Sequence, residues 1–399
     1  MDGREQLTKQ PAAERAGPVA ARSMYALFAA TLLAFIAVGA ALPALSPFVR
    51  GPLHSSDLAA GIVVGCYAAT SVFSRPFAGR FADRRGRHAV FIAGAVTMSL
   101  GGIVYLLSTD VAELIAGRLV VGAGEGALYT AAATWTVDVA PPGRQGFALG
   151  RFGLAVWGGL ALGPLVGELA RSLAGFDAVW AITAALPALC AAVAWPLEEP
   201  AKALRAAGEA HPLVPRATWR PGVALLFGNV GYGALAGFVV LLLAAQGIGG
   251  GAVVFTAFAV AVVASRVLFA HVPDAIGPRR GGLIAAGTET AGFLIVAAAH
   301  SLAAAIVGAA VVGVGFSLLF PSLALLVVAG VPDDGRGAAM GAFSAFFDAG
   351  VGIGAPLAGL TATLAGYPAV FVMAAAASAL GGAVTLAGAY APARLRRTV

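Results

Sequence analysis

The segment "SRPFAGRFADRRGRH" at residues 74–88 carries five arginines, in a chain whose charged residues make up only 11% of the sequence. A degraded copy, "SRVLFAHVPDAIGPR", follows at residues 265–279 after a shift of 191 positions. The matching pairs are Ser74-Arg75 with Ser265-Arg266, Asp83 with Asp274, and Gly86 with Gly277. A dense basic segment that returns half a chain later in such an apolar protein indicates that the fold repeats one unit.

The composition indicates a membrane protein. The chain has 399 residues, 59% of them hydrophobic, and a mean hydropathy of +0.88. Soluble domains are nearer one half apolar, so this chain lacks the polar residues to cover a soluble surface. A bilayer core about 30 Å thick is crossed by a helix of about 20 apolar residues. Runs of that length, separated by short polar or Gly/Pro stretches, predict a series of membrane-spanning helices.

The apolar runs divide into two sets of six around a polar stretch. They occupy residues 24–46, 57–78, 89–108, 111–137, 147–170 and 177–197, and then 222–246, 251–271, 281–300, 302–330, 337–365 and 368–391. We therefore predict an all-α membrane protein with 12 transmembrane helices in two pseudo-symmetric six-helix bundles. The predicted units are an N-terminal bundle (1–197), a cytoplasmic linker (198–221) and a C-terminal bundle (222–399).

The basic residues predict an orientation. A net charge of +6 and a pI near 9.7 are also found in nucleic-acid-binding proteins, but here the arginines lie between apolar runs rather than on one soluble face. If both termini are cytoplasmic, only Arg50 and Arg171 fall on the outer side, as the positive-inside rule requires. We expect a bacterial cytoplasmic (inner) membrane protein with no nucleic-acid partner.

The residues that usually hold metals or perform catalysis form no cluster in the sequence. Cys66 and Cys190 lie in apolar runs, and the five histidines are scattered near segment ends. The chain also shows no nucleophile paired with a base. We therefore predict no cofactor, no metal and no enzymatic activity.

Further repeats support duplication of the six-span unit. "VVGAG" at 120–124 returns as "VVGVG" at 311–315. At a shift of 192, Gly143-Arg144 returns as Gly335-Arg336, and Pro164 and Gly167 return as Pro356 and Gly359. Parallel six-span repeats are one way to build a transporter, with the substrate site between the halves near the middle of the bilayer.

Three motifs resemble those of the major facilitator superfamily. "GRFADRRGRH" at 79–88 resembles the superfamily's loop motif Gly-x-Leu-x-Asp-Arg-x-Gly-Arg-Arg/Lys between its second and third spans, with departures at Phe81 and His88. "RLVVGAGEG" at 118–126 resembles its fourth-span pattern. "GGLALGPLVG" at 158–167 resembles the fifth-span antiporter motif, although Glu168 replaces the last glycine. Over nearly its whole length the chain is similar to the bacterial drug-efflux and arabinose-efflux-permease-like branch.

The resemblance implies that the loop motif latches one half of the protein in its outward-open state. Asp138, at the end of the fourth span, is placed to form an ion pair with Arg84 or Arg87. The alternative is that the arginines only mark the cytoplasmic side of the membrane, and we favour this explanation for Arg80 and Arg85. The predicted latch comprises Gly79, Asp83, Arg84, Gly86, Arg87, Asp138 and Arg144.

Span five carries a face of small residues. Gly159, Gly163 and Gly167 recur every four residues, which lets another helix approach closely in lipid. Pro164 interrupts the hydrogen-bond ladder beside that face and permits a kink. Ordinary helix packing accounts for this pattern too, so the antiporter inference rests on the resemblance.

Ionisable residues inside the predicted spans indicate function, because such residues are costly in lipid and usually face a cavity or a partner. Arg118 and Glu125 share one face of span four but lie about 10 Å apart along the axis, too far for a direct pair. Each acid could instead form a structural ion pair or lie at a helix end exposed to water. We favour a solvated helix end for Asp57 and Glu168. The predicted proton-coupling residues are Arg118, Glu125, Glu289 and Asp348.

Aromatic and polar residues in the spans indicate the substrate only broadly. Asn229 and Tyr232 share a face of span seven, and Trp157 lies in span five, although aromatic residues are also ordinary packing elements. The spans contain fewer Asn, Gln and Asp residues than a sugar site needs, which favours an amphipathic substrate. The predicted substrate-binding residues are Arg118, Glu125, Tyr129, Trp157, Asn229, Tyr232 and Asp348.

The sequence thus predicts a proton-coupled secondary transporter, an H⁺ antiporter that exports a small amphipathic molecule or drug by alternating access. Its expected partners are the substrate, protons and lipid, and we expect it to work as a monomer. An uptake symporter or a facilitator for a metabolite is the alternative within transport. A membrane-embedded sensor or enzyme is the alternative from another class, but no loop is long enough for an output domain.

Overall fold

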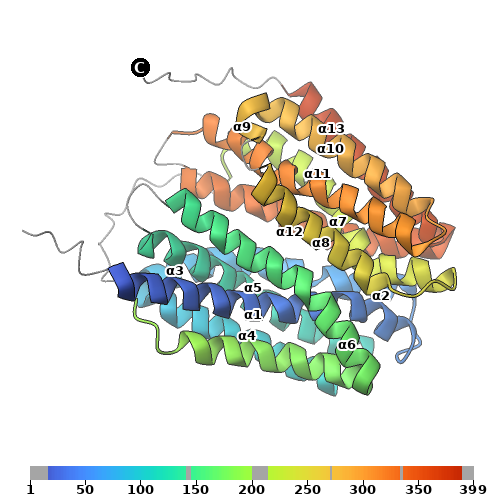
Figure 1. Cartoon of the computed structure of the whole chain (residues 1–399), viewed down its shortest axis with the longest axis horizontal. Coiled ribbons are helices and arrows are strands. Elements are labelled where there is room, and N and C mark those ends of the chain that lie inside the picture. Colours follow the sequence, from blue (N-terminus) through green and yellow to red (C-terminus); the bar gives the residue numbers. More distant parts are fainter. Residues whose placement is uncertain (1–16, 141–144, 200–213, 270–271, 333–335, 389–399) are drawn as a thin grey trace, which may run out of the picture.

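The computed structural model describes residues 17–140, 145–199, 214–269, 272–332 and 336–388. Within these ranges the regular structure is entirely helical, with no strand (Figure 1). The N-terminal helices are α1 (Gly17–Arg50), α2 (Asp57–Gly65), α3 (Tyr67–Arg85), α4 (Arg87–Leu107), α5 (Val111–Val139) and α6 (Gln145–Ala194). The C-terminal helices are α7 (Arg216–Ala245), α8 (Gly251–Leu268), α9 (Val272–Ile276), α10 (Pro278–Ala297), α11 (Leu302–Ala329), α12 (Arg336–Ala365) and α13 (Tyr367–Ala387).

The described helices account for the predicted spans. Nine spans in the described residues are long and apolar enough to cross a membrane, with α2 and α3 joined across Cys66 as one. That count treats α6 as one span. The α6 backbone breaks at Ala174 and Gly175, where the chain folds back, so α6 supplies the fifth and sixth predicted spans (Figure 1). Helices α5 and α10 fall outside that count, but they are 29 and 20 residues long and run the length of the bundle (Figure 1). The all-α membrane fold is confirmed.

Helix α7 begins earlier than the sequence indicated. The predicted linker was the polar stretch that runs to residue 221. Instead Pro215 precedes the helix, and Pro221 lies inside it. The helix therefore starts within the segment assigned to the linker.

The two halves lie side by side along their length (Figure 1). Within the N-terminal half α1 packs on α6 and α4 on α5, and within the C-terminal half α10 packs on α11 and α7 on α12. Contacts between the halves run mainly from α2 to α12 and from α6 to α8. We call the end of the bundle where α3 meets α4 and α7 begins the linker end, and the end that carries Arg50 and Asp57 the opposite end.

Glycines allow the backbones to touch. A methyl group on Gly163 of α6 would lie 2.5 Å from the Cα of Gly39 in α1, and one on Gly159 would lie 2.7 Å from the Cβ of Phe35. One on Gly167 would lie 2.5 Å from the carbonyl oxygen of Ala40. The small face predicted for span five therefore packs directly against α1.

Replacing Gly163 by alanine should lower the stability of the fold, because the added methyl group forces two helix backbones apart. Overpacking of this kind costs about 1–3 kcal/mol. The matched control is Gly150→Ala on the same helix, where an added methyl group meets nothing within 4 Å. Thermal denaturation of the purified proteins in detergent, followed by size-exclusion chromatography, measures the difference. Equal melting temperatures for the two variants would contradict the packing.

Candidate functional site

A cavity of about 140 Å³ lies between the two halves, near the middle of the helices. Four helices from the N-terminal half (α1, α3, α5, α6) and four from the C-terminal half (α7, α8, α11, α12) supply its walls. Its lining combines aromatic residues with charged side chains, and the charged ones are Arg75, Arg118, Glu125, Arg266 and Asp348. Charged residues of both halves thus line this cavity.

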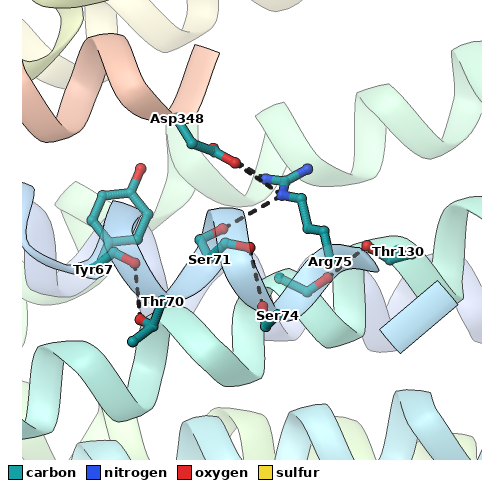
Figure 2. Close-up of polar contacts among 8 residues, drawn as sticks. Tyr67, Thr70, Ser71, Ser74, Arg75, Thr130 and Asp348 are labelled. Atoms are coloured by element: carbon teal, nitrogen blue, oxygen red, sulfur yellow. Dashed lines mark hydrogen bonds and ion pairs between the residues drawn. The ribbon is translucent and has the colours of Figure 1, made fainter. Parts of the chain in front are cut away.

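An ion pair joins the two halves inside this cavity. Arg75 of α3 reaches Asp348 of α12 through two contacts, Nε to Oδ2 at 2.9 Å and Nη2 to Oδ1 at 3.1 Å (Figure 2). Arg75 Nε also donates to Ser71 Oγ at 3.5 Å, and the guanidinium lies 4.8 Å from the ring centre of Tyr129. The Asp348 side chain is only 2% exposed, so little water competes for this bidentate pair.

Sequence reasoning assigned Asp348 to the site but left Arg75 among the basic residues of the loop. Arg75 lies ten residues before the end of α3, at the depth of the cavity. Its partner is 273 residues away in the chain. The signal that could have found it is the repeat, because the Ser-Arg pair is conserved between the two copies while most of the other arginines are not.

Glu125 of α5 also faces the cavity. Its side chain is buried, and among the described residues its Oε2 has no hydrogen-bond partner. It forms no ion pair with Arg118 in the described part of the chain, which agrees with their spacing along the helix. A buried carboxyl group without a fixed partner can gain or lose a proton without breaking other contacts.

Arg118 also lines the cavity but is held by the backbone. Its Nε donates to the carbonyl oxygen of Val63 at 3.0 Å, and its Nη2 donates to that of Val64 at 2.8 Å. These carbonyls lie just before Cys66, where α2 gives way to α3. The guanidinium also lies 4.6 Å from the ring centre of Tyr67. Arg118 thus stabilises the interruption of the second span.

Aromatic rings form the other wall of the cavity. Trp157 of α6 meets Phe316 of α11 edge-on, with ring centres 5.2 Å apart, and Tyr232 of α7 lies 5.4 Å from the same phenylalanine. Phe347 of α12 lies 6.0 Å from Phe316. The predicted residues Tyr129, Trp157 and Tyr232 therefore all line the cavity. This wall suits a flat apolar group.

Two of the predicted site residues lie outside the cavity lining. Asn229 is fully buried in α7 and donates through Nδ2 to the carbonyl oxygen of Leu225 at 2.8 Å. Glu289 is fully buried in α10 and accepts a hydrogen bond from Ser378 of α13 at 3.1 Å. Both lie inside the C-terminal bundle, so a role for either in binding substrate or protons stays a prediction.

The predicted latch forms an ion pair at the linker end. Arg87 Nε lies 2.6 Å from Asp138 Oδ2, and Arg87 Nη1 lies 4.0 Å from Glu199 Oε1. The backbone N–H of His88 also donates to Glu199 at 3.2 Å. Of the two arginines predicted to reach Asp138, Arg87 does so and the side chain of Arg84 is exposed.

The turn between α3 and α4 depends on Gly86. Its φ of 97° lies in the region that favours glycine, and a side chain there would collide with the carboxylate of Glu199. Gly79, one residue of the predicted latch, faces Thr130 of α5. The side chain of Asp83 and the whole of Arg144 lie outside the described residues.

At the opposite end Asp57 joins the two halves. It accepts a hydrogen bond from Tyr367 Oη at 2.9 Å and pairs with Arg50 Nε at 3.0 Å. The sequence suggested a solvated helix end, but the Asp57 side chain is only 14% exposed. That interpretation was wrong because the partner residue comes from the other half. Glu168, by contrast, forms an exposed pair with Arg171.

A charged and aromatic cavity between two helical halves is the arrangement in which transporters built from repeats hold their substrate. The sequence pattern of the Major Facilitator Superfamily matches residues 27–253 and 243–398, and the chain belongs to that family. An uncharacterized MFS-type transporter of Salmonella typhimurium is 32% identical over 377 residues, which cover 91% of this chain and 95% of the relative. An uncharacterized MFS-type transporter of Burkholderia mallei is 34% identical over 364 residues, 89% of each chain.

A solved structure shows the same fold. A bacterial homologue of the human lysosomal transporter Spinster, in an inward-facing and unoccupied conformation, superimposes with a TM-score of 0.75. The match covers 94% of this chain and 100% of that one, at 17% sequence identity. This likeness confirms the fold, while the sequence match and the apolar helices confirm the family and the integral membrane location.

Replacing Arg118 by methionine should destabilise the protein, because it leaves the buried carbonyl groups of Val63 and Val64 without these donors. Each unsatisfied buried group costs about 1–3 kcal/mol. Arg80→Met on α3, where the arginine is exposed, is the control and should melt like the parent protein. Thermal denaturation in detergent measures both. If Arg118→Met melts no lower than Arg80→Met, these hydrogen bonds do not hold the second span.

Proposed function

We propose that this transporter is a proton-coupled antiporter that exports a small amphipathic organic molecule by alternating access. In this proposal it works as a monomer in a bacterial cytoplasmic membrane, with both termini in the cytoplasm. The observation that carries the proposal is the buried Arg75–Asp348 ion pair, which joins the two halves inside their shared cavity.

Protonation of Asp348 changes how firmly the halves hold together. As a carboxylate, Asp348 holds both contacts of Arg75, but as a neutral acid it loses the charge attraction. Removing one partner from a buried pair costs about 3–5 kcal/mol of stability. A difference of a few kcal/mol is enough to shift a two-state equilibrium between inward-open and outward-open forms. Asp348 therefore couples proton binding to the contact between α3 and α12.

Glu125 supplies a second place for the proton. Its carboxyl group faces the same cavity as Asp348, and its Oε2 has no hydrogen-bond partner in the described residues. A proton bound there removes a negative charge from the space that the substrate occupies. Because a charge crossing 100 mV is worth about 2.3 kcal/mol, a proton entering through this cavity can drive export.

Contacts at the two ends of the bundle complete the cycle. Asp57 with Tyr367 joins the halves at the opposite end, so a route for substrate on that side requires them to separate. Arg87 with Asp138 ties α4 to α5 at the linker end, within one half. In the predicted orientation this latch acts on the cytoplasmic side, where it sets how readily the N-terminal half rearranges.

A substrate is first found by growth protection of an efflux-deficient bacterial host, and then followed in inverted vesicles with an imposed pH gradient. The parent protein should accumulate it inside the vesicles. Asp348→Asn and Glu125→Gln should lose this accumulation, because neither amide can carry the proton, and should keep part of the exchange without a gradient. At 100 mV one proton sustains a substrate concentration ratio of about fifty-fold across the membrane, and the variants should lose this ratio.

The control for these variants is Asp177→Asn, which removes an exposed acid from α6 and should accumulate substrate like the parent. Unchanged pH dependence in both Asp348→Asn and Glu125→Gln would refute the coupling assignment. Proton-driven accumulation in right-side-out vesicles instead would identify an uptake symporter.

Replacing Asp138 by asparagine should slow turnover by up to about ten-fold, because a loss of about 1.4 kcal/mol from the latch shifts the balance of conformations. Substrate affinity should change by a smaller factor, since Asp138 lies outside the cavity lining. Transport kinetics over a range of substrate concentrations separate the two effects. Arg80→Gln on α3 is the control, and a turnover rate equal to that control would contradict the latch.

A further inference from the structure

The two repeats place equivalent arginines in the cavity. Arg75 and Arg266 occupy the same position of the repeat at a shift of 191, and each follows a serine. Arg75 extends from α3 and Arg266 from α8, and both line the same cavity. Since the halves are related by duplication, the arrangement around one arginine indicates what to look for around the other.

The carboxylate that pairs with Arg75 has no counterpart beside Arg266. Pro164 of α6 corresponds to Pro356 of α12 at a shift of 192, and this places Val156 where Asp348 stands in the other half. Val156 lines the cavity together with Arg266. After duplication the two repeats diverged, so that Arg75 has an aspartate at this position and Arg266 has a valine.

In the part of the chain that the structure describes, the surroundings of Arg266 supply no other anion. Its guanidinium lies 5.4 Å from the ring centre of Trp157, and its Nη1 would lie 3.2 Å from a methyl group on Gly153. Its Nε is buried and has no hydrogen-bond partner in the described part of the chain. Among those residues no carboxylate lies within 4.0 Å of it, whereas Arg75 and Arg87 both have one. A guanidinium with a buried nitrogen and no anionic partner is stabilised strongly when an anion binds to it.

The other arginines of the cavity are already engaged. Arg75 holds Asp348, and Arg118 holds two backbone carbonyls. Among the described residues, Arg266 is thus the cavity arginine whose guanidinium is available to a ligand. The planar fork of a guanidinium matches a carboxylate through two parallel hydrogen bonds.

We propose that Arg266 binds an anionic group of the substrate, which takes the place that Asp348 occupies beside Arg75. This rests on the proposed function in one respect, that the central cavity holds the substrate. The ring of Trp157 adjoins the arginine and meets the ring of Phe316 edge-on, so the body of the ligand is flat and apolar. The substrate class is therefore an organic anion with a carboxylate next to an aromatic or similarly apolar group.

Binding of a matched pair of probes to the purified full chain in lipid nanodiscs tests this proposal. The probes are 1-naphthoate and its neutral amide, with benzoate and acetate as smaller carboxylates, all measured by calorimetry at one pH and without a gradient. Naphthoate should bind at least about ten-fold more tightly than the amide, as expected for hydrogen bonds between charged groups. Acetate should bind more weakly than either aromatic carboxylate.

Two substitutions test the residues. Arg266→Gln should bring the ratio of naphthoate to amide affinity close to one. Val156→Asp should do the same, because it restores the missing carboxylate and pairs it with Arg266. The matched Val156→Asn variant has nearly the same size without the charge, and it should keep more of the selectivity than Val156→Asp does. This comparison needs no variant that removes Arg266, so a failure of Arg266→Gln to fold leaves the test intact.

Several results would overturn the proposal. They are equal binding of naphthoate and its amide, saturable binding of none of the aromatic carboxylates, or equal selectivity in Val156→Asp and Val156→Asn. Acetate binding as tightly as naphthoate would refute the aromatic part. Because these measurements use no proton gradient, a parent protein that shows no gradient-driven transport in the vesicle assay would refute the coupling while leaving this assignment standing.

Discussion

The constraint that organises this protein is the cost of placing an ionised side chain in the interior of a membrane protein, where each charge needs a partner. The bidentate contact between Arg75 and Asp348 meets that constraint across the boundary between the halves. Had both residues belonged to one half, the pair would only stiffen that half. Because its members belong to different halves, the charge that stabilises each residue also holds the halves together at the depth of the cavity.

Around this pair the contacts between the halves are of a different kind. A methyl group on Gly65 of α2 would lie 2.8 Å from Cδ of Pro356 and 3.0 Å from the carbonyl oxygen of Gly352 in α12, so the two helices pack closely with only small side chains between them. Such smooth surfaces make weak and similar contacts in several positions, and they oppose sliding far less than interlocked side chains do. The polar contacts, Arg75 with Asp348 and Asp57 with Tyr367, then decide which position is preferred.

The sequence predicted the spans, the duplication and part of the aromatic wall, because these follow from apolar runs, from repeated motifs and from aromatic residues inside the spans. It also singled out Glu125 and Asp348, since an acid inside an apolar run is conspicuous. It missed Arg75 and Arg266, because Arg75 adjoins the basic loop in the sequence and Arg266 lies near the end of α8, so topology alone explained both positive charges. The partner of Arg75 comes from another helix, and only the packed fold shows that Arg75 has an aspartate beside it while Arg266 has no carboxylate partner among the described residues.

Divergence between the repeats gives the cavity its chemistry. At a shift of 191 Glu125 corresponds to Phe316, and at a shift of 192 Asp348 corresponds to Val156, so each acid faces the cavity from one half only. The result is one arginine that is neutralised within the protein and one that a ligand can neutralise. An anion leaving the cell and a proton entering it move charge in the same direction across an inside-negative membrane. Each contributes about 2.3 kcal/mol per 100 mV, so an anionic substrate would add to the driving force that the proton supplies.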